Sequence, residues 1–213
     1  GNGETGELVT NNVRAFVNVP VRIPFRGSLT LRGEAVISYS EFLRINERIP
    51  DVTLRYKNPR NLCSGSVRQL NSRITAERRV HFFAFGVVEG LGKKEFPKKS
   101  DQLNWLEKQG FDVVENIRVT KGQLAQQVPR FQGKIKGYDF PSDGLVLTYD
   151  DIAYSESLGS TAKFPRDSIA FKWGDERKET VLLDIEWSPS RTGLINPVAI
   201  FEPVELEGTT VGR

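Results

Sequence analysis

The chain has 213 residues, 38 % hydrophobic and 27 % charged, a composition typical of a globular protein. Its net charge of +3 and pI near 9.0 allow a polyanionic partner without requiring one. No apolar run reaches the length of a membrane span and no signal peptide is recognisable, so we expect no membrane partner. The single cysteine excludes an internal disulfide and a cysteine metal cluster, which predicts a reducing cytoplasm. The single histidine, His81, cannot form a metal site alone, so we expect no metal-ligating residues.

The N-terminal segment is rich in glycine. Residues 1–6 read G-x-G-x-x-G, but no strand precedes them and no acidic residue stands about 20 positions on, so a dinucleotide fingerprint is not expected. We predict a glycine-rich loop that enters a helix with an apolar face of Leu8, Val13 and Phe16, ended by Pro20. Because the sequence contains no methionine, we expect the chain to be processed, cut or otherwise incomplete.

Residues 28–37 alternate between apolar and polar side chains, which predicts a strand. Gly33 permits the close approach of another segment. Glu34, in mid-strand, either forms an ion pair with Arg32 or another neighbour, or accepts hydrogen bonds from the hydroxyl groups of a ligand. Residues 38–41 (Ser-Tyr-Ser-Glu) form a capping box, which predicts a helix that begins after Ser38.

The stretch 56–70 predicts a short helix capped by Asn58, with Pro59 at its first position and Cys63, Val67 and Leu70 as an apolar stripe. Arg60, Ser64 and Arg68 fall at i, i+4 and i+8, which sets the two arginines about 12 Å apart on another ridge. Small residues between two cations allow an anion or a nucleic-acid backbone to come close. The alternative interpretation, equally weighted, is a solvated basic face on a packing helix.

The rest of the chain contains strands and helices in alternation. Residues 81–89 predict a buried strand rich in phenylalanine, with Phe83 and Phe85 on one face, and 100–109 predict a helix that Gly110 ends. A further helix follows Thr120 and is expected to end near Pro129. Strands are predicted at 145–147, after a turn at Asp143 and Gly144, and at 168–173, 180–187 and 198–204.

Three charged residues stand out in this part of the chain. Asp143 lies in the turn that opens a strand, and a tight turn presents Arg191. Lys172 stands between two aromatic residues, where it is either an edge residue with a packed stem or a fixed charge for a phosphate. The charged, non-apolar residues 174–179 mark the best domain boundary.

The order of these motifs resembles the NAD-dependent DNA ligases of bacteria. The stretches that carry the resemblance are residues 1–7, Leu31–Glu34, Lys57–Leu70, Phe82–Gly86, Ser142–Val146, Ile169–Trp173, and the Arg-Thr-Gly at 191–193 followed by Pro-Val-Ala at 197–199. Each is weak alone, but their common order is specific. The resemblance covers essentially the whole chain.

The resemblance implies an α+β class and two domains. Residues 1–176 would be an adenylation domain of the nucleotidyltransferase fold, with antiparallel sheets and flanking helices, missing its N-terminal part. Residues 177–213 would be the first strands of a truncated OB-fold. The parent protein would be a cytoplasmic monomer that seals nicks in duplex DNA during replication and repair, through lysyl-AMP and DNA-adenylate intermediates, with Mg²⁺ neutralising phosphate charge.

The resemblance also implies roles for individual residues. Glu34 would accept hydrogen bonds from the ribose hydroxyls of the AMP moiety of NAD. Phe85 would stack on the adenine ring, and Lys172 would bind the α-phosphate. The remaining candidates are Asp143 and Thr148 in the motif that closes the pocket, Arg60 and Arg68 facing the nucleotide or the DNA 5′-phosphate, and Arg191 at the DNA backbone.

Three departures from the family pattern stand out. The nucleophilic lysine of the Lys-x-Asp-Gly motif is absent, so this chain alone is predicted to be inactive. Thr148 replaces a frequent lysine, which removes a phosphate-binding cation unless another residue substitutes. Phe85 replaces a usual tyrosine and loses a hydroxyl group. Two alternatives remain: a non-catalytic nucleic-acid-binding module, and a related ATP- or GTP-using nucleotidyltransferase.

Overall fold

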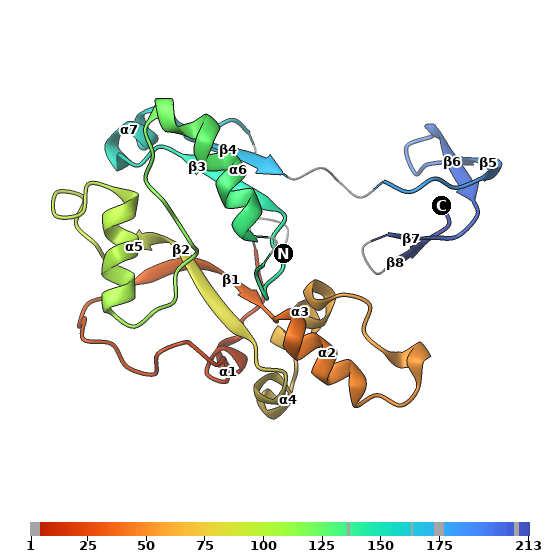
Figure 1. Ribbon diagram of the computed structural model, residues 1–213, viewed down its shortest axis with the longest axis horizontal. Coiled ribbons are helices and arrows are strands. Elements are labelled where there is room, and N and C mark those ends of the chain that lie inside the picture. The colour runs from red at the N-terminus through yellow and green to blue at the C-terminus, as the bar shows by residue number, and fades with distance from the viewer. Residues whose placement is uncertain (1–4, 136, 163, 173–176, 207–208) are drawn as a thin grey trace. The chain divides into compact units, whose positions relative to one another are not determined.

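The structure is a computed structural model that describes all residues except 1–4, 136, 163, 173–176 and 207–208 (Figure 1). The chain divides into two compact units, Gly1–Trp173 and Gly174–Arg213. Because residues 1–4 and Trp173 lie outside the described part, the predicted glycine-rich loop and the end of the predicted 168–173 strand are described only in part.

The first unit contains short helices around two antiparallel strand pairs. Its helical segments are α1 (Thr10–Val13), α2 (Tyr39–Glu47), η1 (Val52–Leu54), α3 (Pro59–Val67), α4 (Ser72–Glu77), α5 (Lys99–Lys108), η2 (Lys121–Gln123), α6 (Leu124–Ile135) and α7 (Ile152–Ser157). Strand β1 (Thr30–Val36) pairs with β2 (His81–Glu89), and β3 (Gly144–Thr148) pairs with β4 (Ser168–Lys172). The predicted mixture of helices and antiparallel strands is confirmed.

The second unit consists of two antiparallel pairs. Strand β5 (Leu182–Pro189) pairs with β6 (Ile195–Phe201), and β7 (Val204–Leu206) pairs with β8 (Thr209–Val211). The turn between β5 and β6 is closed by the Ser190 backbone N–H, which donates to the Leu194 carbonyl at 2.7 Å. Gly193 in this turn has a φ of +82°, a conformation that glycine adopts without strain.

Local sequence signals explain where several helices begin and end. The Ser38 hydroxyl accepts from the Glu41 backbone N–H at the start of α2, and the Asn58 side chain accepts from the Asn61 backbone N–H at the start of α3. These contacts satisfy donors that a helix start leaves unpaired. Gly110, with a φ of +94°, follows the end of α5 as predicted.

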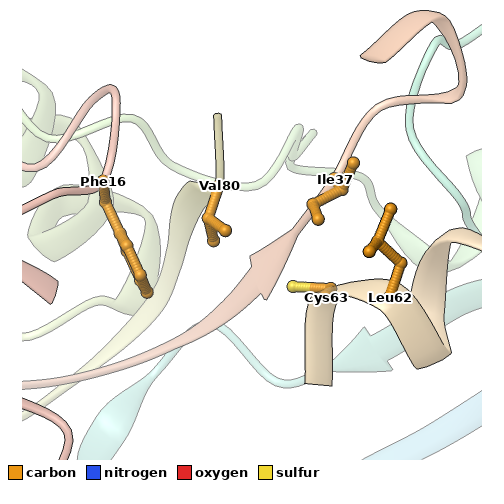
Figure 2. Packing of buried hydrophobic residues seen from close by; sticks show 5 residues of the cluster. All are labelled: Phe16, Ile37, Leu62, Cys63 and Val80. Carbon is orange, nitrogen blue, oxygen red and sulfur yellow. The ribbon is translucent and has the colours of Figure 1, made fainter. Parts of the chain in front are cut away.

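The core of the first unit lies where α3 meets the end of β1. Figure 2 shows Ile37 facing the side of α3 that carries Leu62 and Cys63, with Val80 and Phe16 completing the cluster. A second cluster lies between α5 and β2, where Leu103 and Leu106 pack against Ala84. These contacts position β1 and α3, the two elements that carry most of the candidate site.

The predicted N-terminal helix is wrong in length and in its buried face. Only Thr10–Val13 is helical, and Leu8 is 94 % exposed. Phe16 is buried as expected, but the chain has left the helix by then, and the backbone N–H of Val17 donates to the carbonyl of Val80 at 2.9 Å. This tertiary hydrogen bond and the core contact of Phe16 outweigh the local helical pattern.

Two further expectations about helices are corrected. Leu70 was predicted in the apolar stripe of α3 but is fully exposed, because the helix ends at Val67 and the 3.6-residue period does not continue. The helix predicted to end near Pro129 instead continues to Ile135. Its half-buried side chains, Leu124, Val128, Phe131 and Ile135, share one face, so packing offsets the missing N–H of the exposed proline.

Candidate nucleotide-binding site

A pocket of about 420 Å³ lies where the end of β1 meets α3. Its lining contains two acidic side chains, two guanidinium groups and an apolar floor. The lining residues are Glu7, Val9, Glu34, Ala35, Val36, Ile37, Pro59, Arg60, Cys63, Ser64, Val67, Arg68 and Pro141. Three of the predicted site residues, Glu34, Arg60 and Arg68, therefore meet at one pocket.

Strand β1 carries Glu34 at the pocket, and the neighbouring Gly33 packs closely against β2. A Cβ atom at Gly33 would lie 2.2 Å from Cζ of Phe82 and 2.6 Å from the carbonyl oxygen of Phe83, so only glycine fits there. Glu34 pairs in register with Phe83 of β2. Among the described residues no ion pair joins Glu34 to Arg32 or to another neighbour.

Helix α3 places its two arginines at opposite ends of the pocket wall. Arg60 lies in the first turn, and Arg68 directly follows Val67, the last residue of the helix. The Arg68 side chain folds back along the helix, where Nε donates to the Ser64 carbonyl at 3.2 Å. Nη1 of Arg68 lies 3.9 Å from a carboxylate oxygen of Glu7. Ser64 lies between the two cations in the lining, as its spacing predicted.

Cys63 also lines the pocket, a role that sequence reasoning missed. Its helical position, three residues after Arg60, was the available signal. Burial, together with the charge of Glu34, raises the pKa of the Cys63 thiol to about 12. The group therefore stays protonated near neutral pH and acts as part of the apolar floor, since the thiolate is the nucleophilic form.

The turn before β3 is connected to α3 through an ion pair. An Asp143 carboxylate oxygen accepts from Nη2 of Arg60, and both side chains are more than half exposed. Gly144 pairs in register with Lys172 across β3 and β4, so Lys172 lies beside the residue that follows Asp143. Pro141, two residues before Asp143, belongs to the pocket lining.

Five predicted residues lie outside the pocket lining: Asp143, Lys172 and Arg191, and also Phe85 and Thr148. Phe85 is 49 % exposed on β2. Thr148 pairs in register with Ser168 at the far end of β3, and its Oγ1 accepts from Nζ of Lys99 at 2.7 Å. Lys99, which sequence reasoning did not single out, also pairs with Asp167 at 2.5 Å. It brings an ammonium group to the side chain of Thr148.

Arg191 belongs to the second unit, in the turn between β5 and β6, where it is exposed. The hydroxyl groups of Ser190 and Thr192, its two neighbours, lie 3.0 Å apart. The turn is therefore held by its own hydrogen bonds, and it presents the Arg191 side chain to solvent.

The described residues contain no cluster of three or more histidine, cysteine or acidic side chains that would enclose a metal ion. Mg²⁺ commonly needs only one or two carboxylates when substrate phosphates and water supply the other ligands. No described helix is long and apolar enough to cross a membrane.

Comparison with known proteins identifies the family of the chain. The family model of the NAD-dependent DNA ligase adenylation domain matches residues 1–176. The chain is similar to the DNA ligases of Ruminiclostridium cellulolyticum (63 % identical over 213 residues), Lachnoclostridium phytofermentans (62 % over 213) and Clostridioides difficile (36 % over 216). Each match covers all of this chain but only 32 %, 33 % and 32 % of the respective relative. The chain therefore spans about a third of the length of these ligases. The chain belongs to the NAD-dependent DNA ligase adenylation domain family.

Proposed function

We propose that this chain is part of an NAD-dependent DNA ligase and that its pocket binds the AMP moiety of NAD. The observation that carries the proposal is the meeting of Glu34, Arg60 and Arg68 at one pocket. A carboxylate accepts hydrogen bonds from ribose hydroxyls, and guanidinium groups bind phosphate through charge-assisted hydrogen bonds. The family match favours NAD over the ATP- or GTP-using alternative.

The proposed reaction has three steps in the parent protein. A lysine amine attacks the AMP phosphorus of NAD and forms a phosphoramide bond while nicotinamide mononucleotide leaves. AMP then passes to the 5′-phosphate at a nick, and the 3′-hydroxyl displaces it. Arg60, Arg68 and Lys172 would stabilise phosphate charge during these transfers. Mg²⁺, held by the substrate phosphates, would supply further charge neutralisation.

Calorimetric titration of the chain with AMP tests the pocket assignment. We expect measurable binding that Glu34→Ala and Arg60→Ala each weaken by about tenfold, since each removes a hydrogen bond in which one partner is charged. Glu107→Ala, on the exposed side of α5, is the matched control and should leave the affinity unchanged. Equal affinities of all four proteins would contradict the proposal.

We further propose that this chain alone does not form the lysyl-AMP intermediate, because no Lys-x-Asp-Gly occurs in its sequence. Incubation with NAD labelled in the adenylate group should leave the chain unlabelled. Acid-labile, lysine-linked AMP on the chain would contradict this part of the proposal and would point to a different nucleophile.

Nicked duplex DNA is the second proposed partner. The exposure of Arg60 and Arg68 at the pocket and of Arg191 in the second unit supports it. Binding should fall steeply with salt, and Arg191→Ala should reduce the slope of log K against log[salt] by about 1. A flat salt dependence would contradict a phosphate-backbone contact. We place the parent protein in the cytoplasm as a monomer.

A further inference from the structure

Arg68 lies just beyond the end of α3. The residues before and after it both accept a hydrogen bond from the side chain of Asn12. Nδ2 of Asn12, in α1, donates to the carbonyl of Val67 at 2.7 Å and to the carbonyl of Gln69 at 2.7 Å. The last carbonyls of a helix lack partners within the helix. Asn12 satisfies two acceptors at this end, one on each side of Arg68.

The Asn12 amide is itself fixed by a buried network. Asn12 is 5 % exposed, and Thr75 and Ser66 are fully buried. Oγ1 of Thr75 lies 3.2 Å from Oδ1 of Asn12 and 2.9 Å from the Ser66 carbonyl. Because Oδ1 faces a hydroxyl group, the NH₂ group is directed at the two carbonyls. Arg78 continues the network behind α3, donating to the hydroxyl of Ser66 at 3.1 Å.

The same N-terminal segment also contacts the side chain of Arg68. Glu7 lies five residues before Asn12, and its carboxylate is 3.9 Å from Nη1 of Arg68. Asn12 thus holds the backbone on both sides of Arg68, while Glu7 holds the guanidinium group. The segment 7–12 therefore helps to set where this cation lies in the pocket, together with Ser64, whose carbonyl accepts from Nε of Arg68.

We propose that Asn12 is a positioning residue for Arg68, directing its guanidinium group toward a phosphate bound in the pocket. The choice of phosphate as ligand rests on the proposed function, whereas the positioning itself rests on the hydrogen bonds of Asn12. Asparagine suits this place because one planar group supplies two donors and one acceptor at fixed angles. Aspartate would set a carboxylate oxygen against carbonyl oxygens, and alanine would leave two carbonyls unpaired.

A double-mutant cycle between Asn12→Ala and Arg68→Ala tests the proposal, with AMP and adenosine as probes. Asn12→Ala should weaken AMP binding by about tenfold, change adenosine binding by less than about twofold, and have no further effect in the Arg68→Ala background. Asn18→Ala is the matched control, because Asn18 also makes two backbone hydrogen bonds, to the N–H and carbonyl of Phe82. Equal loss of AMP and adenosine binding, or additive effects of the two substitutions, would overturn the proposal.

A spectroscopic measurement separates this proposal from that of AMP binding. In the chain without ligand, the Nε–Hε resonance of Arg68 should move toward the value of a freely rotating arginine in Asn12→Ala and stay in place in Asn18→Ala. If Asn12→Ala does not fold, Thr75→Val, which removes the hydroxyl that fixes the amide, should move the resonance in the same direction. An unchanged resonance would overturn the positioning role, whereas failure of the wild-type chain to bind AMP would contradict only the proposed ligand.

Discussion

The pocket wall formed by β1 and α3 is held differently from the β3–β4 strand pair that carries Asp143, Thr148 and Lys172. The wall rests on an apolar core and on a fully buried hydrogen-bond network. The strand pair has exposed apolar side chains, including Val146 and Ile169, and is connected to its surroundings by polar contacts such as Lys99 to Asp167. The backbone that carries the binding residues of the wall is therefore fixed by packing and buried hydrogen bonds, whereas the strand pair depends more on charged contacts.

The largest effect on the free energy of unfolding is expected when a core side chain beneath the wall is truncated. Leu62 is 1 % exposed and packs in the cluster shown in Figure 2. Leu62→Ala should lower the free energy of unfolding by about 2–5 kcal/mol, because it removes buried surface and leaves a cavity. Urea denaturation measures the change. A loss below ~1 kcal/mol would contradict the view that packing fixes the wall.

A smaller effect is expected at the polar connection of the strand pair. Lys99→Met keeps the apolar stem but removes the hydrogen bonds to Thr148 and Asp167, and should cost about 1–2 kcal/mol of unfolding free energy. Lys93→Met is the control, since Lys93 and Glu156 form an exposed ion pair that should be worth no more than about 1 kcal/mol. Equal costs in the two variants would remove the distinction between these contacts.

Acid should weaken the polar connections before the apolar wall. A hydrogen bond from Lys99 lowers the pKa of Asp167, and one from Ser40 lowers the pKa of Asp139. For both carboxylates the pKa in the folded state lies below the pKa in the unfolded state. Each therefore stabilises the fold at pH values above its unfolded-state pKa. This stabilisation is lost as the pH falls through the folded-state pKa. We expect the free energy of unfolding to decrease below about pH 4.

The pH profile of the double variant Asp139→Asn and Asp167→Asn checks this prediction. Its unfolding free energy should be lower than that of the wild type at neutral pH and should vary less across the acid range. Parallel profiles of the two proteins would show that other groups cause the acid sensitivity.

The smallest effect is expected at the ion pair between the wall and the turn before β3. Asp143→Asn should change the free energy of unfolding by less than about 0.5 kcal/mol, because both Asp143 and Arg60 are more than half exposed. Thermal unfolding at low and high salt measures it. A loss above ~2 kcal/mol would show that the pair, rather than the core, sets the shape of the pocket.

Local signals in the sequence were sufficient for several elements. Ser38 and Asn58 cap the helices that they were predicted to cap, and Gly110 follows the end of α5. These features depend on contacts within a few residues. Leu70 and Pro129 were misjudged because the end of α3 is bound by the distant Asn12 and because α6 continues past its proline with one half-buried apolar face.

For the candidate site, too, the sequence predicted local features better than contacts between distant residues. Motif order indicated Glu34, Arg60 and Arg68, which meet at the pocket. Asn12 and Lys99 were not identified, because their partners lie 55 and 57 residues away for Asn12 and 49 and 68 for Lys99. A single sequence contains no periodic signal for contacts of this kind, which arise only when the chain is folded.

The most direct test of the AMP pocket is amide chemical-shift mapping of the chain during titration with AMP. If AMP binds in this pocket, the largest shifts occur at Glu34–Ile37 and at residues 60–68, while α5 is unaffected. We also expect adenosine to reproduce the shifts around Glu34 but not those at Arg68. Absence of shifts at both segments, or shifts confined to α5 and the second unit, would contradict the assignment of this pocket.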